Sequence, residues 1–280
     1  MAASKSRALV RNTPAETGAG TAGLAPAAYG PKTLAIDIGG TNLKAGLLDS
    51  AGTMIGERVR IPTMHPSQPD RVVPALVGLA GRLGAFDRIS IGFPGVICDG
   101  VVKTAPNLGT EAWAGFDLAA AMQTHLGKPA RVLNDATVQG LGVISGHGLE
   151  CVITLGTGFG FALYQDGRLT PHLELSQHIA RKTMTYDEYL GVEALYRVGR
   201  KHWRRRVQRI LVQLRVLVGF DVLYIGGGDA EALKMKLPSD IRIVSNNAGI
   251  TGGVRLWDSH LDEAFTTTGR CCGSARSRAT

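Results

Sequence analysis

The feature that most constrains the fold is a β-turn-β pattern that occurs twice, far apart in the chain. In both places a short apolar run ends in a turn of glycine and threonine, and a second apolar run leads to a turn with aspartate and glycine. The two copies cover residues 34–52 and 151–168. Apolar runs bounded in this way are typical of β-hairpins. Their repetition predicts two related halves.

The composition agrees with a folded chain large enough to hold two such halves. Its 280 residues are 44% apolar and 19% charged, which excludes a disordered protein, a collagen-like fibre and a small disulfide scaffold. No apolar run approaches the roughly 18 to 20 residues that a membrane helix needs. The four cysteines lack C-x-x-C spacing, so we expect reduced thiols, no zinc and a cytoplasmic protein.

The remaining segments alternate between strand-like apolar runs and stretches with helical spacing. Strands are expected at residues 53–61, 88–93, 130–133, 222–225 and 241–244, and helices at 72–83, 116–126, 186–217, 230–236 and 252–261. The expected organisation is a disordered tail over residues 1–32, an N-terminal α/β lobe over 33–133, a C-terminal α/β lobe over 134–265 and a tail over 266–280.

The first hairpin turn has the chemistry of a phosphate site. Glycines after a strand let backbone N–H groups approach an anion closely, Thr41 adds a hydroxyl donor and Lys44 adds a positive charge. Asp37, at the end of the strand, has the side chain that a hydrated Mg²⁺ bridging phosphates would take. The alternative is an ordinary hairpin turn.

The second turn, Gly156-Thr157-Gly158, indicates little alone, because a hairpin of this composition needs no ligand. Paired with the first turn, it predicts two backbone clamps that face one phosphate chain. The chain has no G-x-x-x-x-G-K-[ST] segment, which excludes a P-loop nucleotide site. It also has no G-x-G-x-x-G after a strand, which argues against a Rossmann cofactor.

Asn134 and Asp135 end an expected strand and open a helix. A carboxylate there has two interpretations. It can accept a proton from a substrate hydroxyl that attacks phosphorus, as phosphoryl transfer requires. It can also cap the helix, and both roles are compatible.

Other polar groups lie in loops. Asn107 and the run from Glu174 to His178 have amides and carboxylates that suit a polyol, or they are solvated loop residues. The Gly226-Gly227-Gly228 turn follows a buried strand, and it is either a close-approach site for a flat or anionic ligand or a helix-entry turn.

Positive charge is concentrated in one expected helix. The formal net charge of the whole chain is +8, and residues 197–215 have eight arginines and lysines with no acid. The cations lie mainly opposite an apolar stripe that includes Trp203. They form a solvated face, a nucleic-acid contact with little aromatic interleaving, or a site for a polyanionic phosphate donor.

Taken together and in this order, these motifs resemble the ROK family of sugar kinases, over residues 33–265. The resemblance is carried by Asp37-Ile38-Gly39-Gly40-Thr41, Ala105-Pro106-Asn107-Leu108, Asn134-Asp135-Ala136 and Leu155-Gly156-Thr157-Gly158. Within the family, the bacterial polyphosphate/ATP glucokinase (glucomannokinase) group is the most similar, because it shares a stretch like Thr185–Gly191, a basic helix and a triple-glycine turn.

The resemblance implies a two-lobed actin-like (ribonuclease H-like) α/β fold with a central cleft, and a cytoplasmic glucokinase. Phosphate would pass from ATP or polyphosphate, with Mg²⁺, to the 6-hydroxyl of glucose or a close hexose. It also implies a homodimer, with no nucleic-acid or membrane partner.

The resemblance assigns the following roles. Asp135 would be the general base. The sugar would be bound by Asn107, Asn134, Asp135, Glu174 and Gln177. The phosphates would be bound by Gly39, Gly40, Thr41, Lys44, Gly156, Thr157 and Gly158. The nucleoside of ATP would face Gly226, Gly227 and Gly228. Polyphosphate would also contact Lys201, Arg204 and Arg205, and Mg²⁺ would contact Asp37.

One departure concerns the sugar. The family usually has Glu-x-Gly-His, whereas this chain has Glu174-Leu175-Ser176-Gln177, with His178 one position late. Gln177 can donate a hydrogen bond to a hydroxyl but cannot be charged. An alternative is therefore a non-catalytic sugar-binding or sugar-sensing member of the same family.

Overall fold

The computed structural model describes residues 30–262 and residue 265, and it contains two five-stranded sheets. The first has the order β3-β2-β1-β4-β7 and the second the order β10-β9-β8-β13-β14. The strands of the first sheet are β1 (Thr33–Ile38), β2 (Asn42–Leu48), β3 (Met54–Pro62), β4 (Arg88–Phe93) and β7 (Ala130–Asn134). Those of the second are β8 (Leu149–Leu155), β9 (Phe159–Gln165), β10 (Arg168–Leu169), β13 (Val222–Gly226) and β14 (Ile241–Ile243).

Both sheets have the same plan. In the first, β1 pairs antiparallel with β2 and parallel with β4; in the second, β8 pairs antiparallel with β9 and parallel with β13. The two hairpins that the sequence predicts therefore occupy equivalent places, each next to a parallel strand. Two short ribbons, β5–β6 (Ile97–Cys98 and Val101–Val102) and β11–β12 (Ile179–Arg181 and Met184–Thr185), lie outside the sheets.

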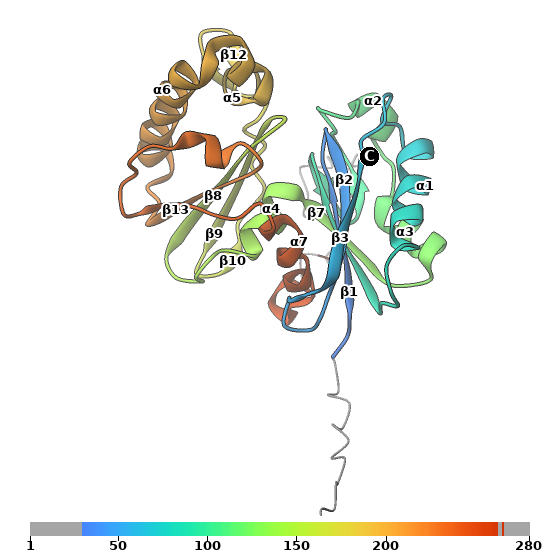
Figure 1. Cartoon of the computed structure of the whole chain (residues 1–280). Coiled ribbons are helices and arrows are strands. Elements are labelled where there is room, and N and C mark those ends of the chain that lie inside the picture. The colour runs from blue at the N-terminus through green and yellow to red at the C-terminus, as the bar shows by residue number, and fades with distance from the viewer. Residues whose placement is uncertain (1–29, 263–264, 266–280) are drawn as a thin grey trace, which may run out of the picture.

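Helices form three layers around the sheets (Figure 1). The outer layer of the first sheet contains α1 (Pro69–Ala80) and α3 (Leu118–Leu126), with the short α2 (Thr110–Trp113) near them. The outer layer of the second contains α5 (Tyr186–Leu190) and α6 (Val192–Val218). Between the sheets lie α4 (Asp135–Leu141), α7 (Ala248–Thr251) and the 3₁₀ turns η2 (Gly252–Trp257) and η3 (Ser259–Leu261).

Two expected helices are shorter than predicted. Residues 230–236 form only the 3₁₀ turn η1 (Ala230–Leu233), and residues 252–261 form η2 and η3 rather than an α-helix. The expected helix over 186–217 is divided, because Gly191 separates α5 from α6 and Gly199 has a positive φ of 74° within α6. Positive φ suits glycine, which has no Cβ to clash.

The C-terminal segment returns to the first sheet. Trp257 donates its indole N–H to Ser90 of β4 over 2.9 Å, and the Arg131 guanidinium lies 4.4 Å from the centre of the Trp257 ring. Residues 248–257, from the expected second lobe, thus pack on β1 and β4, whereas η3 contacts β10 of the second sheet. The lobe boundary at residue 133 stays a prediction. Most of the two expected tails lies outside the described residues.

Within the described part of the chain, no helix combines the length and the apolar character that a bilayer span requires.

Close packing of α4 against β9 yields a stability prediction. Tyr164 of β9 donates its hydroxyl to the Thr137 carbonyl oxygen over 2.5 Å, and a Cβ on Gly140 would lie 2.6 Å from Tyr164 Cε2. We expect Gly140→Ala to lower the free energy of unfolding by about 1–3 kcal/mol, the usual range for overpacking. Urea unfolding followed by circular dichroism measures this change.

The matched control is Gly78→Ala in α1, where an added Cβ meets no atom within 4 Å. Alanine there should stabilise the protein by about 0.5–1 kcal/mol, because it restricts the unfolded chain and favours the helix. Equal effects of the two substitutions would contradict the packing argument.

Candidate functional site

The two glycine turns meet face to face. The hydroxyls of Thr41, between β1 and β2, and Thr157, between β8 and β9, lie 2.9 Å apart within hydrogen-bonding distance. The backbone at Gly40 packs so closely that a Cβ there would lie 2.8 Å from Thr157 Cγ2. A single floor is therefore built from two segments that are remote in the sequence.

Each turn is supported from behind. Thr63 donates its hydroxyl to the Gly39 carbonyl oxygen over 2.6 Å. Phe159 donates its backbone N–H to Asp187 Oδ1 over 2.6 Å, and Val192 donates its own to the Gly156 carbonyl oxygen over 2.8 Å. These bonds fix the turns with their exposed backbone facing the cleft.

The turns form part of a cleft with a volume of about 390 Å³. Most of the site residues that the sequence predicts line this cleft, from both hairpins, from the strand-helix junctions and from the loop at residue 174. They are Asp37, Gly39, Gly40, Thr41, Lys44, Asn107, Asn134, Asp135, Gly156, Thr157, Gly158, Glu174, Gly227 and Gly228. Gln177, Gly226, Lys201, Arg204 and Arg205 are not among the lining residues.

Asp135 is the first residue of α4 and is partly buried, with its carboxylate at the cleft. Its Oδ1 accepts the Ala136 N–H over 2.8 Å. Burial raises the pKa of Asp135 to about 7, and the negative charges of Asp37 and Glu174 contribute to the rise. A carboxylate that titrates near neutral pH is suited to exchange protons with a substrate.

Asn134, rather than Asp135, caps α4. Its Oδ1 accepts the Thr137 N–H over 3.2 Å, and its Nδ2 donates to the Gly95 carbonyl oxygen over 3.2 Å. The side chain is 8% exposed. Because the neighbouring amide satisfies the helix end, the carboxylate of Asp135 is free to face the cleft.

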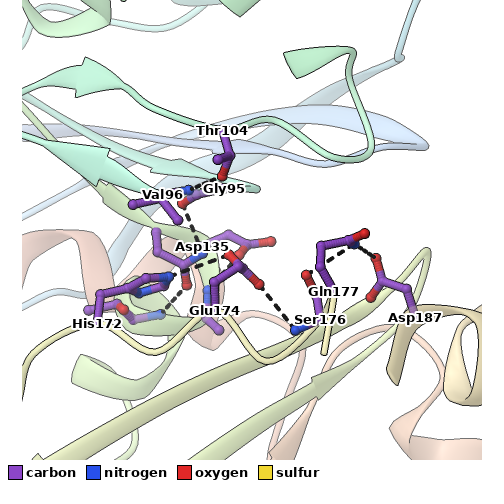
Figure 2. A network of polar contacts seen from close by, with 12 residues as sticks. Gly95, Val96, Thr104, Asp135, His172, Glu174, Ser176, Gln177 and Asp187 are labelled. Atoms are coloured by element: carbon purple, nitrogen blue, oxygen red, sulfur yellow. Dashed lines mark hydrogen bonds and ion pairs between the residues drawn. The ribbon is translucent and has the colours of Figure 1, made fainter. Parts of the chain in front are cut away.

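Glu174 lies on the opposite wall, where Figure 2 shows it between His172 and Ser176. His172 Nε2 lies 3.4 Å from Glu174 Oε2, and the Ser176 N–H donates to Glu174 Oε1 over 3.3 Å. Burial favours the neutral acid, yet the hydrogen bonds from His172 and Ser176 outweigh it and hold the pKa of Glu174 below its usual value. The cleft thus contains two carboxyl groups whose pKa values are shifted in opposite directions, upward for Asp135 and downward for Glu174.

Asp187 is a residue that sequence reasoning missed. It is the second residue of α5, and it connects two predicted sugar contacts with the second glycine turn. Gln177 donates to its Oδ2 over 3.1 Å (Figure 2), Asn107 does so over 3.5 Å, and Phe159 donates to its Oδ1. Burial raises the pKa of Asp187 to about 6.

The only sequence signal for Asp187 is its place in the first turn of a capped helix, which predicts a surface acid. Gln177 itself is exposed and points to Asp187. Gln177 therefore does not line the cleft, and it is connected to the lining residue Asn107 through the carboxylate of Asp187.

Asp37 and Lys44 form an ion pair of 2.7 Å at the floor of the cleft. Among the described residues no group of three or more histidine, cysteine, aspartate or glutamate side chains is arranged around a metal position. Mg²⁺ is compatible with this arrangement, because it is commonly held by one or two carboxylates together with substrate phosphates. Asp37 lines the same cleft as the two glycine turns and has the carboxylate that this role requires.

The triple-glycine turn is only partly open to the cleft. Gly227 has a positive φ of 88° and its α-carbon packs against the backbone of Leu155, so no larger residue fits there. Gly228 is exposed, with no atom within 4 Å of an added Cβ. The buried Gly226 instead packs against the amide of Gln139.

The basic helix α6 covers the second sheet and extends away from the cleft (Figure 1). Arg204 donates to the Ala232 carbonyl oxygen over 2.9 Å, and Arg206 and Arg209 contact Tyr189. Lys201 and Arg205 are exposed. Several of these cations therefore bind the protein itself.

Comparison with known proteins identifies the family of the chain. Residues 33–172, half of its length, match the ROK family. The chain belongs to the ROK family. The solved structure of an inorganic polyphosphate/ATP-glucomannokinase from Arthrobacter sp. strain KM superposes with a TM-score of 0.74 at 30% identity, over 81% of this chain and 98% of that one.

Two further ROK relatives agree. The polyphosphate glucokinase of Mycobacterium tuberculosis is 28% identical over 233 residues, which cover 78% of this chain and 88% of that protein. A ROK family glucokinase from Streptomyces griseus, solved with glucose and AMPPNP, has a TM-score of 0.68 at 20% identity over 80% of this chain and 98% of that one. The predicted two-lobed actin-like fold of ROK sugar kinases is confirmed.

The raised pKa of Asp135 predicts a stability change that depends on pH. Folding disfavours the ionised form of the Asp135 side chain and therefore lowers the free energy of unfolding wherever that side chain is ionised in the native state. This loss is absent below pH 3.8, the unfolded pKa, and complete above about pH 7. We expect Asp135→Asn to stabilise the protein at about pH 8 by on the order of 1–3 kcal/mol, with the gain shrinking toward about pH 4.

Urea unfolding at several pH values measures this gain. The control is Asp166→Asn, because hydrogen bonds from Gln165 and Gly148 lower the pKa of Asp166, and its loss should not stabilise the protein at any pH. A gain for Asp135→Asn that is independent of pH would contradict the assignment.

Proposed function

We propose that the protein is a hexose kinase that transfers a phosphoryl group from polyphosphate, ATP or both to the 6-hydroxyl of glucose. Sugar kinases with this fold and related sequences support the reaction class. The observation that carries the proposal is the juxtaposition in one cleft of two glycine turns and one carboxyl group with a pKa of about 7.

In this proposal the sugar lies between Asp135 and the wall that contains Glu174. Glu174 would accept hydrogen bonds from the sugar hydroxyls, and Asn107 would both accept and donate them. Asn134 is largely committed to the helix cap, and we propose that it acts with its remaining N–H donor. Gln177 would act through Asp187, which also accepts a hydrogen bond from Asn107.

Asp135 would take the proton of the 6-hydroxyl as that oxygen attacks the terminal phosphorus of the donor. The bond between this phosphorus and the bridging oxygen of the donor breaks, and the remainder of the donor leaves with the electron pair. The N–H groups of the glycine turns, together with Thr41, Thr157 and Lys44, lie where they can stabilise charge on the phosphoryl oxygens.

Asp37 would hold Mg²⁺, which supplies positive charge to the phosphate oxygens when it is bound. With ATP as donor, the nucleoside would lie near Gly227 and Gly228, while Gly226 supports that turn from within the core.

The first test is formation of glucose 6-phosphate, measured in a coupled assay with ATP and with polyphosphate in parallel. We expect turnover with at least one donor and faster turnover with polyphosphate. Binding of glucose without phosphorylation by either donor would favour a non-catalytic sugar-binding protein. The substitution of Gln177 for the usual histidine motivates that second candidate.

The second test addresses the base. Asp135→Asn keeps the shape of the side chain but accepts no proton, and loss of a positioned base lowers kcat by about 10²- to 10⁴-fold. In wild type kcat/KM should fall as pH decreases through about 7, because Asp135 becomes protonated there. A variant with nearly wild-type kcat would remove Asp135 from this role.

A further inference from the structure

Two arginines of β3 line the cleft beyond the residues that the sequence motifs assign to it. Arg58 and Arg60 both contribute to its wall. Arg60 is the cross-strand partner of Lys44, and Lys44 is the partner of Asp37. The residues thus form a row across β1, β2 and β3, and β3 is the edge strand of the first sheet.

The row continues toward the proposed base on the other side. Asp37 pairs with Gly92 of β4, and β4 pairs through Phe93 with Asn134, which precedes Asp135. Neighbouring strands lie about 4.8 Å apart, so Arg60 is roughly 10 Å beyond Asp37, on the side away from Asp135. A donor whose terminal phosphate faces Asp135 reaches Arg60 if it extends along this row.

The two arginines of β3 differ from Lys44 in their pairing. Lys44 is neutralised by its ion pair with Asp37. Among the described residues, neither Arg58 nor Arg60 forms an ion pair; Arg58 donates to the amide oxygen of Asn247 over 3.1 Å. Two guanidinium groups therefore face the cleft, and guanidinium is the side chain best suited to bind phosphate through paired hydrogen bonds.

The cleft is lined mainly by polar residues and glycines. Besides the two arginines, its polar lining residues include Asn42, Asp229 and Asn246. Among the described lining residues the only aromatic side chain is Phe159, which is 3% exposed and packs against Tyr186. Among the described lining residues a nucleobase therefore has no exposed aromatic ring to stack on, whereas phosphate groups have two arginines without an acidic partner.

From these observations we infer that Arg58 and Arg60 form an extension of the donor site, which binds phosphate units beyond the one transferred and selects a long inorganic polyphosphate chain. The inference rests on the proposed kinase function. It assigns the recognition of the polymer to β3 rather than to the basic helix α6, whose predicted contacts Lys201, Arg204 and Arg205 do not line the cleft.

The test is the double substitution Arg58→Gln and Arg60→Gln, assayed with ATP, tripolyphosphate and long-chain polyphosphate. We expect KM for long-chain polyphosphate to rise about 10-fold, equivalent to about 1.4 kcal/mol. KM for ATP and kcat with every donor should stay within about twofold, because contacts made equally before and during transfer affect KM alone. The matched control is Arg82→Gln, an exposed arginine of the same lobe outside the cleft.

A second readout does not need turnover. Long-chain polyphosphate should raise the melting temperature of wild type more than tripolyphosphate does, and the double variant should lose this dependence on chain length. If wild type phosphorylates no sugar but shows this dependence through Arg58 and Arg60, the binding site stands and the kinase function fails.

Two results would overturn the inference. One is a double variant whose KM for long-chain polyphosphate is unchanged, or rises equally for ATP. The other is a rise in this KM for the variant with Lys201→Gln and Arg205→Gln, the two exposed cations of α6 that the sequence assigned to polyphosphate, and not for the β3 variant. The variant Arg58→Lys with Arg60→Lys should recover part of the affinity for the polymer, because it keeps both charges but not the paired hydrogen bonds.

Discussion

The contact between Thr41 and Thr157 is the interaction on which the site depends. It joins two turns that are 116 residues apart in the sequence, over a hydroxyl-to-hydroxyl distance of 2.9 Å. Without this approach each turn is an ordinary hairpin end with a few exposed N–H groups. With it, two sets of backbone donors face one volume, and an anion between them is bound from both sheets.

Carboxyl groups are arranged around that volume with different protonation. Asp37 is paired with Lys44, Glu174 is held ionised by its hydrogen bonds, and Asp135 is left without a cation of its own. Burial and the neighbouring negative charges then raise its pKa to about 7. Of these three lining carboxyl groups, Asp135 is the one whose pKa is raised toward neutral pH, and the cap made by Asn134 leaves its side chain free to face the cleft.

Much of the fold follows from local patterns. The two hairpins, the strands at residues 88–93 and 222–225 and the Asn134-Asp135 junction were predictable, because apolar runs bounded by glycine and polar residues favour strands and turns wherever they occur. The parallel pairing of those strands with the hairpins was not predicted. The short 3₁₀ turns after β13 and β14 were not predicted, because their apolar residues have the spacing of an α-helix. Asp187 was missed for a related reason: a first-turn acid is common on surfaces, and only the fold brings it behind the second glycine turn.

The sequence by itself determined which residue types stand at the ends of strands, and hence that two glycine turns and a carboxylate were present. Only the tertiary structure decided which of them share one cleft. It turned the basic helix α6 away from that cleft and brought Arg58 and Arg60 of an edge strand into it. The physical reason is that local periodicity specifies only which face of a helix or strand is buried. Contacts between segments that are far apart in the chain decide which residues that face packs against.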